Sequence, residues 1–252
     1  MSAHSQRLRA RLATAQGDPE VGDERIVVYH EDGRTEELLL HEYARLYALP
    51  GVYEQIVQED LGCRSPAVAA EMLGAALDAL GRDRARTRII DLAAGNGVSG
   101  EALAAAGMLP VLGTDLEPAA RPAALRDRPG IYGEYLTLDL TALTEPQTRH
   151  LRELKADAVT CVAPVGAAPG QVPPQALASV LRLTGPDTLS VHLHDPRHGL
   201  PDAVDEAFWR RELGELEASL IERRRYLHRF RVTGAPYEME AAVWRLRRPG
   251  LG

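Results

Sequence analysis

Cysteine, the residue that builds many structural zinc sites and all disulfide scaffolds, is scarce in this chain. Only two of its 252 residues are cysteines, Cys63 and Cys161, and 98 positions separate them. Because neither belongs to a CxxC pair or has a paired histidine, they argue against a structural zinc site, and we expect no bound metal. So low a cysteine content also argues against a secreted scaffold held together by disulfides.

Long apolar runs and excess positive charge are missing too. No apolar run approaches the roughly 20 residues that a membrane-spanning helix needs, so we expect no membrane partner. Residues 1–11 lack the apolar core of a signal peptide, which favours a cytoplasmic protein. A net charge of −7 gives the chain no general attraction for polyanions, and we expect no nucleic-acid partner. The densest group of arginines is interpreted as the solvated ends of a helix and a strand: Arg223, Arg224, Arg225, Arg229 and Arg231.

Length and composition suit one α/β domain with a small appendage. Hydrophobic residues make up 45% of the chain and charged residues 26%, ordinary values for a globular enzyme. We expect the appendage to be residues 1–60, comprising a frayed leader, a β-hairpin and a lid rich in tyrosine. Asp32-Gly33 between the apolar runs 25–30 and 36–40 predicts the hairpin. The lid would contain Tyr43, Tyr47 and Tyr53.

Residues 61–252 are predicted to form the main domain. Ser65-Pro66 is typical of a helix start, and this helix should run to about Leu80. From residue 88 strands and helices alternate, which indicates a parallel sheet covered on both faces. The expected strands are 88–91, 110–115, 135–139, 158–162 and 188–194. The expected helices are 100–106, 119–125, 145–155 and 174–183.

The carboxyl-terminal quarter has a different pattern. Residues 202–225 predict one long helix. The strand-like runs 225–232 and 237–247 then flank Thr233-Gly234-Ala235-Pro236, which predicts an antiparallel hairpin.

Three aspartates end three successive predicted strands: Asp91, Asp115 and Asp139. In an open α/β sheet, ligands bind outside the carboxyl ends of the strands, so these carboxylates are placed to meet a polar ligand. Each could instead cap a helix or begin a turn, which is common for aspartate after a strand. Three in a row favour the ligand site.

The loop after the first of these strands is rich in glycine. Gly95 to Gly100 matches GxGxxG, with Asp115 near the distance at which a ribose-binding carboxylate falls, as in NAD(P)-dependent reductases. However, Asp91 lies four residues before Gly95, where it would repel a pyrophosphate and suit a cationic sulfonium. The pattern favours an adenosyl sulfonium ligand, with the nicotinamide-dependent reductase as the alternative.

The same loop resembles a known family motif. Asp91-Leu92-Ala93-Ala94-Gly95-Asn96-Gly97 is similar to the DxGxGxG motif of the class I S-adenosylmethionine-dependent methyltransferases, with Ala93 replacing the first glycine. Residues 111–116 and 138–140 resemble the family's second and third motifs, and 156–162 resembles its fourth strand. The likeness covers most of residues 40–248, although Gly185-Pro186-Asp187 departs from the usual Pro-Gly-Gly turn.

The resemblance implies a fold, a cofactor and a set of binding residues. The implied fold is an α/β, Rossmann-like parallel sheet of about seven strands that ends in an antiparallel hairpin, with helices on both faces. The implied cofactor is S-adenosylmethionine. Its ribose would be held by Asp115, its adenine ring would pack on Leu116, and the adenine amino group would donate to Asp139. The other implied cofactor-binding residues are Tyr43, Tyr47 and Tyr53 of the lid, Asp91, Ala93, Gly95, Asn96 and Gly97 of the loop, and Leu140 and Val162.

The candidates for catalysis follow the last parallel strand. They are His192, His194, Asp195 and His198. We expect His194 and Asp195 at the rim of the cleft as catalytic residues, with His194 as the general base. His192 is interpreted as an interior residue and His198 as a loop residue.

Other candidates lie elsewhere in the chain. Cys161 is expected to be buried in a strand rather than to act as a nucleophile. His41 and Glu42 would either touch the substrate or lie at the surface.

The acceptor of the methyl group is expected to be a small molecule. The acidic balance and the lid, which favours an enclosed pocket, both point this way. The methyl group would move to oxygen, nitrogen or carbon of that molecule, in a monomer or homodimer. A non-catalytic protein that binds S-adenosylmethionine is the second alternative.

Overall fold

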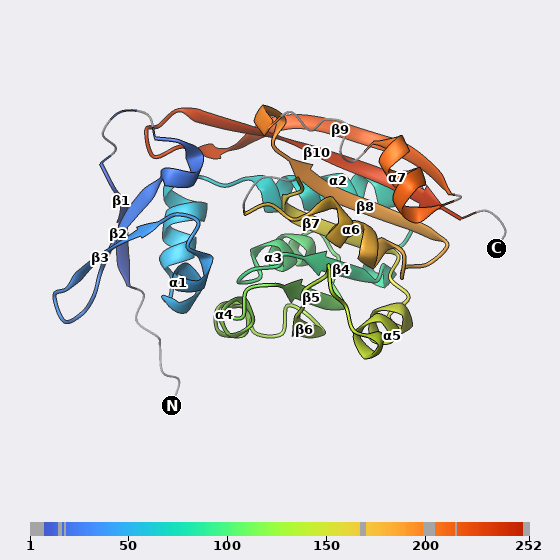
Figure 1. Cartoon of the computed structure of the whole chain (residues 1–252), viewed down its shortest axis with the longest axis horizontal. Helices are drawn as coiled ribbons and strands as arrows, with labels where there is room; N and C mark the ends of the chain where they lie inside the picture. Colours follow the sequence, from blue (N-terminus) through green and yellow to red (C-terminus); the bar gives the residue numbers. More distant parts are fainter. Residues whose placement is uncertain are drawn as a thin grey trace.

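Seven strands form the larger of two β-sheets in the computed structural model. The model describes residues 8–14, 17, 19–166, 170–198, 205–214 and 216–248, with residue 198 described by its backbone alone. The strands of this sheet are β4 (Ile89–Leu92), β5 (Leu112–Asp115), β6 (Glu134–Thr137), β7 (Ala158–Pro164), β8 (Asp187–His194), β9 (Glu217–Phe230) and β10 (Pro236–Arg247). Their order across the sheet is β6-β5-β4-β7-β8-β10-β9 (Figure 1).

The pairing within this sheet confirms the predicted fold class. The strands from β4 to β8 pair in parallel, whereas β10 is antiparallel to both β8 and β9. Each of the five expected parallel strands is present within a few residues of its predicted bounds. From β4 the chain adds β5 and β6 on one side, then crosses to add β7 and β8 on the other side. This reversal of the strand order at β4 creates the switch point where ligands bind in such sheets.

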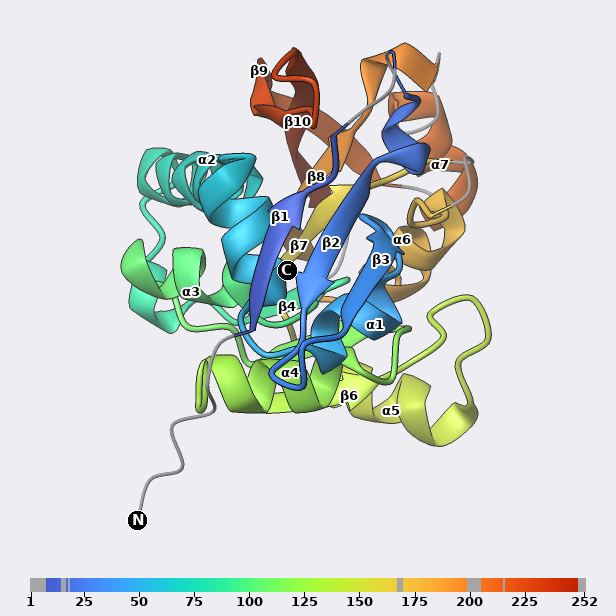
Figure 2. The same cartoon turned by 90° about the vertical axis from the view of Figure 1, so that its left-hand side faces the viewer.

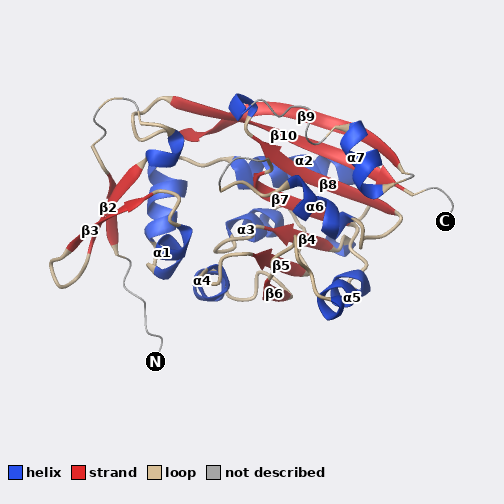
Figure 3. Ribbon diagram, viewed as in Figure 1, coloured by secondary structure: helices blue, strands red, loops and turns tan. Residues whose placement is uncertain are grey.

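Helices cover both faces of the sheet (Figure 3). They are α2 (Ser65–Ala79), α3 (Val98–Ala105), α4 (Ala120–Asp127), α5 (Glu145–Glu153), α6 (Pro174–Leu181) and α7 (Glu206–Leu213). One core lies between the sheet and helices α2 and α3, with Leu73 and Leu103 at its centre. A second core lies on the other face beneath α5, α6 and α7.

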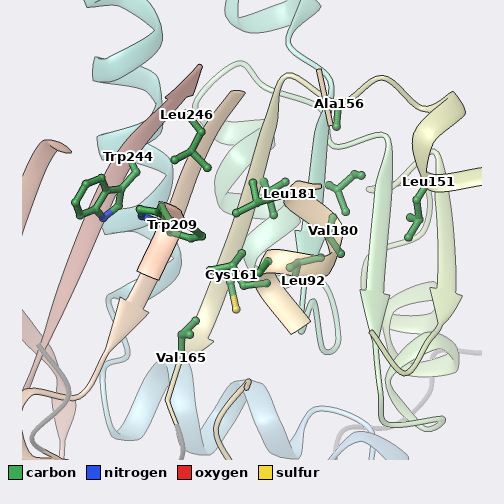
Figure 4. Close-up of a cluster of buried hydrophobic side chains, with 14 of the residues drawn as sticks. Leu92, Leu151, Ala156, Cys161, Val165, Val180, Leu181, Trp209, Trp244 and Leu246 are labelled. Atoms are coloured by element: carbon green, nitrogen blue, oxygen red, sulfur yellow. The ribbon is translucent and has the colours of Figure 1, made fainter. Parts of the chain in front are cut away.

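Of the residues considered for catalysis, Cys161 belongs to the second core (Figure 4), and His192 packs against a tryptophan of this core. Cys161 is fully buried on β7, and this burial raises the pKa of its thiol to about 12, which confirms the interior reading. His192 is also confirmed as an interior residue, because it is 1% exposed and its ring lies 5.8 Å from that of Trp209. Trp209 in turn packs edge-to-face on Trp244, with ring centroids 6.4 Å apart.

The amino-terminal part forms a small antiparallel sheet and two helical segments. The strands are β1 (Arg9–Leu12), β2 (Arg25–Tyr29) and β3 (Thr35–Leu39), and β2 and β3 form the predicted hairpin. The helical segments are α1 (Tyr43–Ala48) and a π-helical stretch, Glu54–Asp60. The leader was expected to be frayed, but residues 9–12 of it form β1, because Ala10 is buried against the hairpin. The domain boundary at residue 60 stays a prediction.

The long helix predicted over residues 202–225 is wrong in the described part of that range, 205–214 and 216–225, and residues 202–204 and 215 lie outside the described residues. The helix α7 covers only Glu206–Leu213, is capped at its start by the Asp205 carboxylate, and ends at Gly214, where φ is +77°. The chain then enters β9, which pairs with β10 along its length. Glutamate and arginine favour a helix locally, but this pairing overrides that preference.

None of the helices in the described ranges is long and apolar enough to cross a bilayer. The same residues contain no cluster of three or more His, Cys, Asp or Glu side chains suited to a metal ion.

Candidate functional site

A cavity of about 830 Å³ lies at the carboxyl ends of β4, β5 and β7. Figures 1 and 2 show α1 and the small sheet across this end of the larger sheet. The described lining comes from six parts of the chain: the tyrosine-rich segment, the start of α2, the loop after β4, the ends of β5, β6 and β7, the segment that leads into α6, and the β9–β10 hairpin. Its volume is in the range that encloses a cofactor-sized ligand.

The loop after β4 is held in an unusual backbone conformation. Ala93, Gly95 and Gly97 have φ angles of +51°, +53° and +91°, and Gly97 directly precedes α3. Such left-handed angles favour glycine and cost an alanine about 1–2 kcal/mol. A Cβ atom at Gly95 would lie 2.5 Å from the hydroxyl of Tyr47, so the lid also leaves no room for a side chain there.

Asp115 joins this loop to the end of β5. Its Oδ2 accepts a hydrogen bond from the Gly95 N–H (2.9 Å), and its Oδ1 accepts one from the Glu117 N–H (2.9 Å). Burial raises the pKa of its carboxyl, although these bonds oppose the shift. Asp115 lines the cavity beside Leu116, a leucine that is 68% exposed. An acceptor and an apolar surface therefore lie next to each other.

Asp91 occupies a different position from the expected one. It is completely buried and accepts hydrogen bonds from the hydroxyls of Ser99, Tyr132 (2.7 Å) and Thr160 (2.6 Å). Burial raises its pKa, while the three bonds oppose that shift. Asp91 is not among the described residues that line the cavity. It ties β4 to α3 and β7 behind the loop, so the structure does not support a direct contact with a cofactor.

Most of the remaining expected cofactor residues also line the cavity. Asp139, Leu140 and Val162 all belong to the lining, as do Ala93 and Asn96, whereas Gly97 does not. The Asp139 carboxylate is exposed and accepts bonds from the backbone and hydroxyl of Thr141, which lower its pKa. The turn-forming role considered for this aspartate is therefore observed alongside its place at the cavity.

Three tyrosines of the lid line the cavity together. The rings of Tyr43 and Tyr47 are stacked with centroids 5.7 Å apart, and Tyr53 lies 5.3 Å from Tyr47. The structure thus brings the three predicted lid residues to one wall. Arg126 of α4 donates to the backbone oxygen of Tyr47 (3.0 Å), which fixes this wall to the main domain.

An ion pair also connects the lid segment to the glycine loop. Arg128 lies 2.5 Å from the carboxylate of Glu54, and both side chains are nearly buried. The side-chain amide of Asn96 donates to the same carboxylate (2.8 Å), and Arg128 donates to the Asn96 backbone oxygen (3.2 Å). Lid and loop are therefore positioned by one polar network.

The predicted catalytic pair does not line the cavity in the described structure. His194 is 7% exposed, and its Nε2 lies 2.9 Å from the Glu240 carboxylate on β10. Asp195 accepts from the Tyr237 hydroxyl (2.7 Å) and pairs with Arg197 (2.7 Å). Only the backbone of His198 is described. The catalytic role of His194 and Asp195 stays a prediction that this geometry does not favour.

The sequence did not predict the side of the cavity that the β9–β10 hairpin forms. His228 and Tyr237 come from this hairpin, and Cys63 and Ser65 come from the segment at the start of α2. His41 and Glu42 also belong to the lining. A lone histidine and a tyrosine in two paired strands were the only signal for these residues, and no motif marks them.

Arg229 on this hairpin is buried rather than solvated. It is 3% exposed and forms an ion pair with Glu24, which is completely buried. Glu24 also accepts from the backbone N–H of Val232 (2.9 Å). The interpretation of Arg229 as a solvated strand end is therefore wrong, because Glu24, the residue before β2, lies against it as a buried counter-ion.

The described lining of the cavity carries excess negative charge. Four carboxylates belong to it: Glu42, Asp115, Glu117 and Asp139. Its two arginines are Arg45 and Arg229, and each is paired with a glutamate outside the lining, Glu36 and Glu24. The lining residues that the structure describes therefore offer no unpaired arginine or lysine to an anionic ligand.

No protein-family model and no curated protein matches the chain. Solved structures do. An S-adenosylmethionine-dependent methyltransferase of Anabaena variabilis superposes with a TM-score of 0.51 at 13% identity, covering 84% of this chain and 96% of that one. A protein of Pyrococcus horikoshii described as an RNA methyltransferase has a TM-score of 0.50 at 16% identity, covering 71% of this chain and 83% of that one. The chain has the Rossmann-like fold of the S-adenosylmethionine-dependent methyltransferases.

Proposed function

We propose that this protein is a methyltransferase that moves a methyl group from S-adenosylmethionine to a small molecule. The observation that carries the proposal is the position of Asp115 at the switch point of the sheet. Each of its carboxylate oxygens accepts one backbone N–H and retains a further lone pair that a ribose hydroxyl can use. Leu116, exposed beside it, offers the apolar surface that an adenine ring needs.

The charge and polarity of the lining fit this cofactor. S-adenosylmethionine carries a sulfonium, an ammonium and one carboxylate group, so its net charge is positive, and the carboxylates of the lining favour that charge. The hydroxyl of Thr114, also in the lining, is buried and has no hydrogen-bond partner among the described residues. A buried hydroxyl usually has a partner, so a polar group of a ligand would satisfy it.

A nicotinamide dinucleotide fits the same loop less well. Its pyrophosphate would need backbone N–H groups at the start of α3. The Gly95 N–H is already donated to the Asp115 carboxylate, and that negative charge would lie beside the phosphates. The lining offers them no unpaired arginine in its described part.

In this proposal the protein orients the reactants rather than supplying a reactive group. The cofactor provides an electrophilic methyl group on a positively charged sulfur when bound. The stacked tyrosines and the buried Glu54–Arg128 pair hold the lid over the loop and exclude water from this end of the cavity. Orientation and exclusion of water contribute on the order of 7–11 kcal/mol to such displacements.

A small acceptor is favoured by the space beyond the cofactor residues. His228, Tyr237 and Cys63 line a part of the cavity that the cofactor residues do not. The lid segment forms one wall of this cavity, which favours a small molecule over an extended polymer. Side chains do not fill this part of the cavity, which also argues against the non-catalytic alternative.

Calorimetric titration tests the proposal. We expect the purified protein to bind S-adenosylmethionine and S-adenosylhomocysteine, and Asp115→Asn to weaken both. Binding of NADH without binding of either adenosyl ligand would replace the proposal with the reductase. Binding of both adenosyl ligands, with no methylated product from a broad panel of small molecules, would favour the non-catalytic alternative.

A further inference from the structure

Three side chains on the hairpin side of the cavity form a hydrogen-bonded chain. The Tyr226 hydroxyl lies 2.6 Å from Ser65 Oγ, and Ser65 Oγ lies 2.6 Å from His228 Nδ1. Ser65 and Tyr226 are buried, whereas His228 is half-buried and lines the cavity together with Ser65. The chain therefore runs from the interior to the cavity wall.

Counting hydrogens assigns a direction to this chain. If Tyr226 donates to Ser65 and Ser65 donates to His228 Nδ1, both hydroxyl hydrogens are used and the imidazole hydrogen lies on Nε2. In the opposite direction His228 donates to Ser65 and Ser65 donates to Tyr226. The Tyr226 hydrogen would then have no acceptor among the described residues, which is costly for a buried hydroxyl. The first direction satisfies all three groups, and it also presents Nδ1 as an acceptor to the Cys63 thiol, whose Sγ lies 3.9 Å from it.

The surroundings keep the imidazole neutral. Burial and then the nearby Arg229 lower the pKa of His228 to about 3. His41 and Arg197 act in the same direction, and only Asp195 opposes them. A neutral ring with its Nδ1 engaged by Ser65 has one remaining nitrogen, Nε2, and this nitrogen has no partner in the described part of the chain.

We infer that His228 binds the methyl acceptor, donating a hydrogen bond from Nε2 to an uncharged oxygen, either a hydroxyl or a carbonyl. This inference rests on the proposed function and names the class of its acceptor. The acceptor is uncharged there because the described lining has no unpaired arginine for an anion. The ring of Tyr237, perpendicular to His228 at 5.2 Å, adds an aromatic surface.

The position of His228 separates this role from cofactor binding. β9 and β10 stand at the opposite side of β4 from β5 in the strand order, and β5 carries Asp115. His228 is therefore placed across the cavity from the ribose-binding carboxylate. Ser65 and Tyr226 are positioning residues, since they act through the imidazole.

The test is a histidine ¹⁵N NMR titration of the full chain loaded with S-adenosylhomocysteine. Phenol and acetophenone are the uncharged probes and benzoate is the anionic control. We expect the Nε2–H tautomer at His228, with its Nε2 shift moved saturably by the two uncharged probes and left unmoved by benzoate. Ser65→Ala should change the tautomer equilibrium and weaken phenol binding about 2- to 10-fold, the range for one lost hydrogen bond.

The chain provides a matched control pair outside the cavity. Ser190 Oγ lies 3.3 Å from His192 Nδ1, and both residues are buried away from the lining. We expect Ser190→Ala to leave phenol binding unchanged. If Ser65→Ala does not fold, Tyr226→Phe provides a second variant that interrupts the hydrogen bonds from Tyr226 through Ser65 to His228.

Three results would overturn the inference: an Nδ1–H tautomer at His228, tighter binding of benzoate than of phenol, or phenol binding that Ser65→Ala and Tyr226→Phe leave unchanged. If S-adenosylhomocysteine itself does not bind, the proposed function fails separately. The phenol titration of the cofactor-free protein then still decides whether His228 holds an uncharged oxygen.

Discussion

The carboxylate of Asp115 accepts a hydrogen bond from the backbone N–H of Gly95 at 2.9 Å. This bond joins the loop after β4 to the end of the neighbouring parallel strand β5, at the point where the strand order of the sheet reverses. It also uses the N–H that a phosphate would need and leaves an anion in the cavity. One contact thus favours a cationic adenosyl ligand over a dinucleotide.

Asp115→Asn should weaken binding of S-adenosylhomocysteine about 10- to 100-fold. The reason is the loss of one charge-assisted hydrogen bond to a ribose hydroxyl, worth about 1.5–3 kcal/mol, because asparagine keeps only one acceptor oxygen. Calorimetry measures the change. Asp139→Asn is the control, and we expect it to change the affinity less than about threefold because Asp139 is exposed to water. Equal effects at the two positions would argue against ribose binding by Asp115.

Gly95→Ala should destabilise the protein through a clash with the lid. The new Cβ would lie 2.5 Å from the Tyr47 hydroxyl, in addition to the strain of a positive φ angle. Gly107→Ala separates the two effects, because Gly107 has a φ of +81° and open space around it. We expect about 1–2 kcal/mol loss at Gly107 and more at Gly95, measured by urea unfolding. Tyr47→Phe should restore part of the Gly95→Ala loss, and no restoration would show that the hydroxyl is not the obstacle.

Asp187→Asn should lower stability at neutral pH but not in strong acid. Hydrogen bonds first from Arg245, and then from Arg82, lower the pKa of Asp187 from 3.8 to about 2. A lowered folded-state pKa stabilises the native protein above 3.8, and this contribution is lost as the pH falls through about 2. Since the carboxylate is about one-third exposed, solvent screening limits the effect to about 1 kcal/mol. Urea unfolding at pH 7 and at pH 2 measures it, and a difference between wild type and variant that grows in acid would contradict the assignment.

His194→Ala should leave ligand binding intact. His194 does not line the described cavity and pairs with Glu240, so we expect affinity for S-adenosylhomocysteine and phenol within about twofold of wild type. His228→Ala should abolish saturable phenol binding while sparing the cofactor. Loss of phenol binding in His194→Ala alone would support the catalytic position predicted from the sequence.

Much of the proposed cofactor-binding part of the cavity could be predicted, because the sequence signals for it are local. A run of apolar residues, a carboxylate and a glycine turn lie next to one another in the chain, and the backbone angles at Gly95 and Gly97 require what those glycines provide. Asp115 and Leu116 directly follow a strand, so their place at its end follows from the strand alone. Asp91 shows the limit, since its burial depends on Tyr132, 41 positions away.

The part of the cavity formed by the β9–β10 hairpin and the start of α2 could not be predicted, because its contacts join distant segments. Ser65 meets His228 across 163 positions, and Glu24 meets Arg229 across 205. Residues 217–225 also look helical by composition until β10 pairs with them. No local pattern carries such pairings.

The amino-acid sequence by itself determined the alternation of strands and helices, the glycine loop and the carboxylates at the strand ends, because hydrophobic periodicity and backbone preference act between neighbours. Only the tertiary structure decided that Asp91 supports the loop from behind, that His194 lies outside the cavity, and that His228 faces it. Those outcomes depend on which surfaces pack together, and packing is decided by residues far apart in the chain.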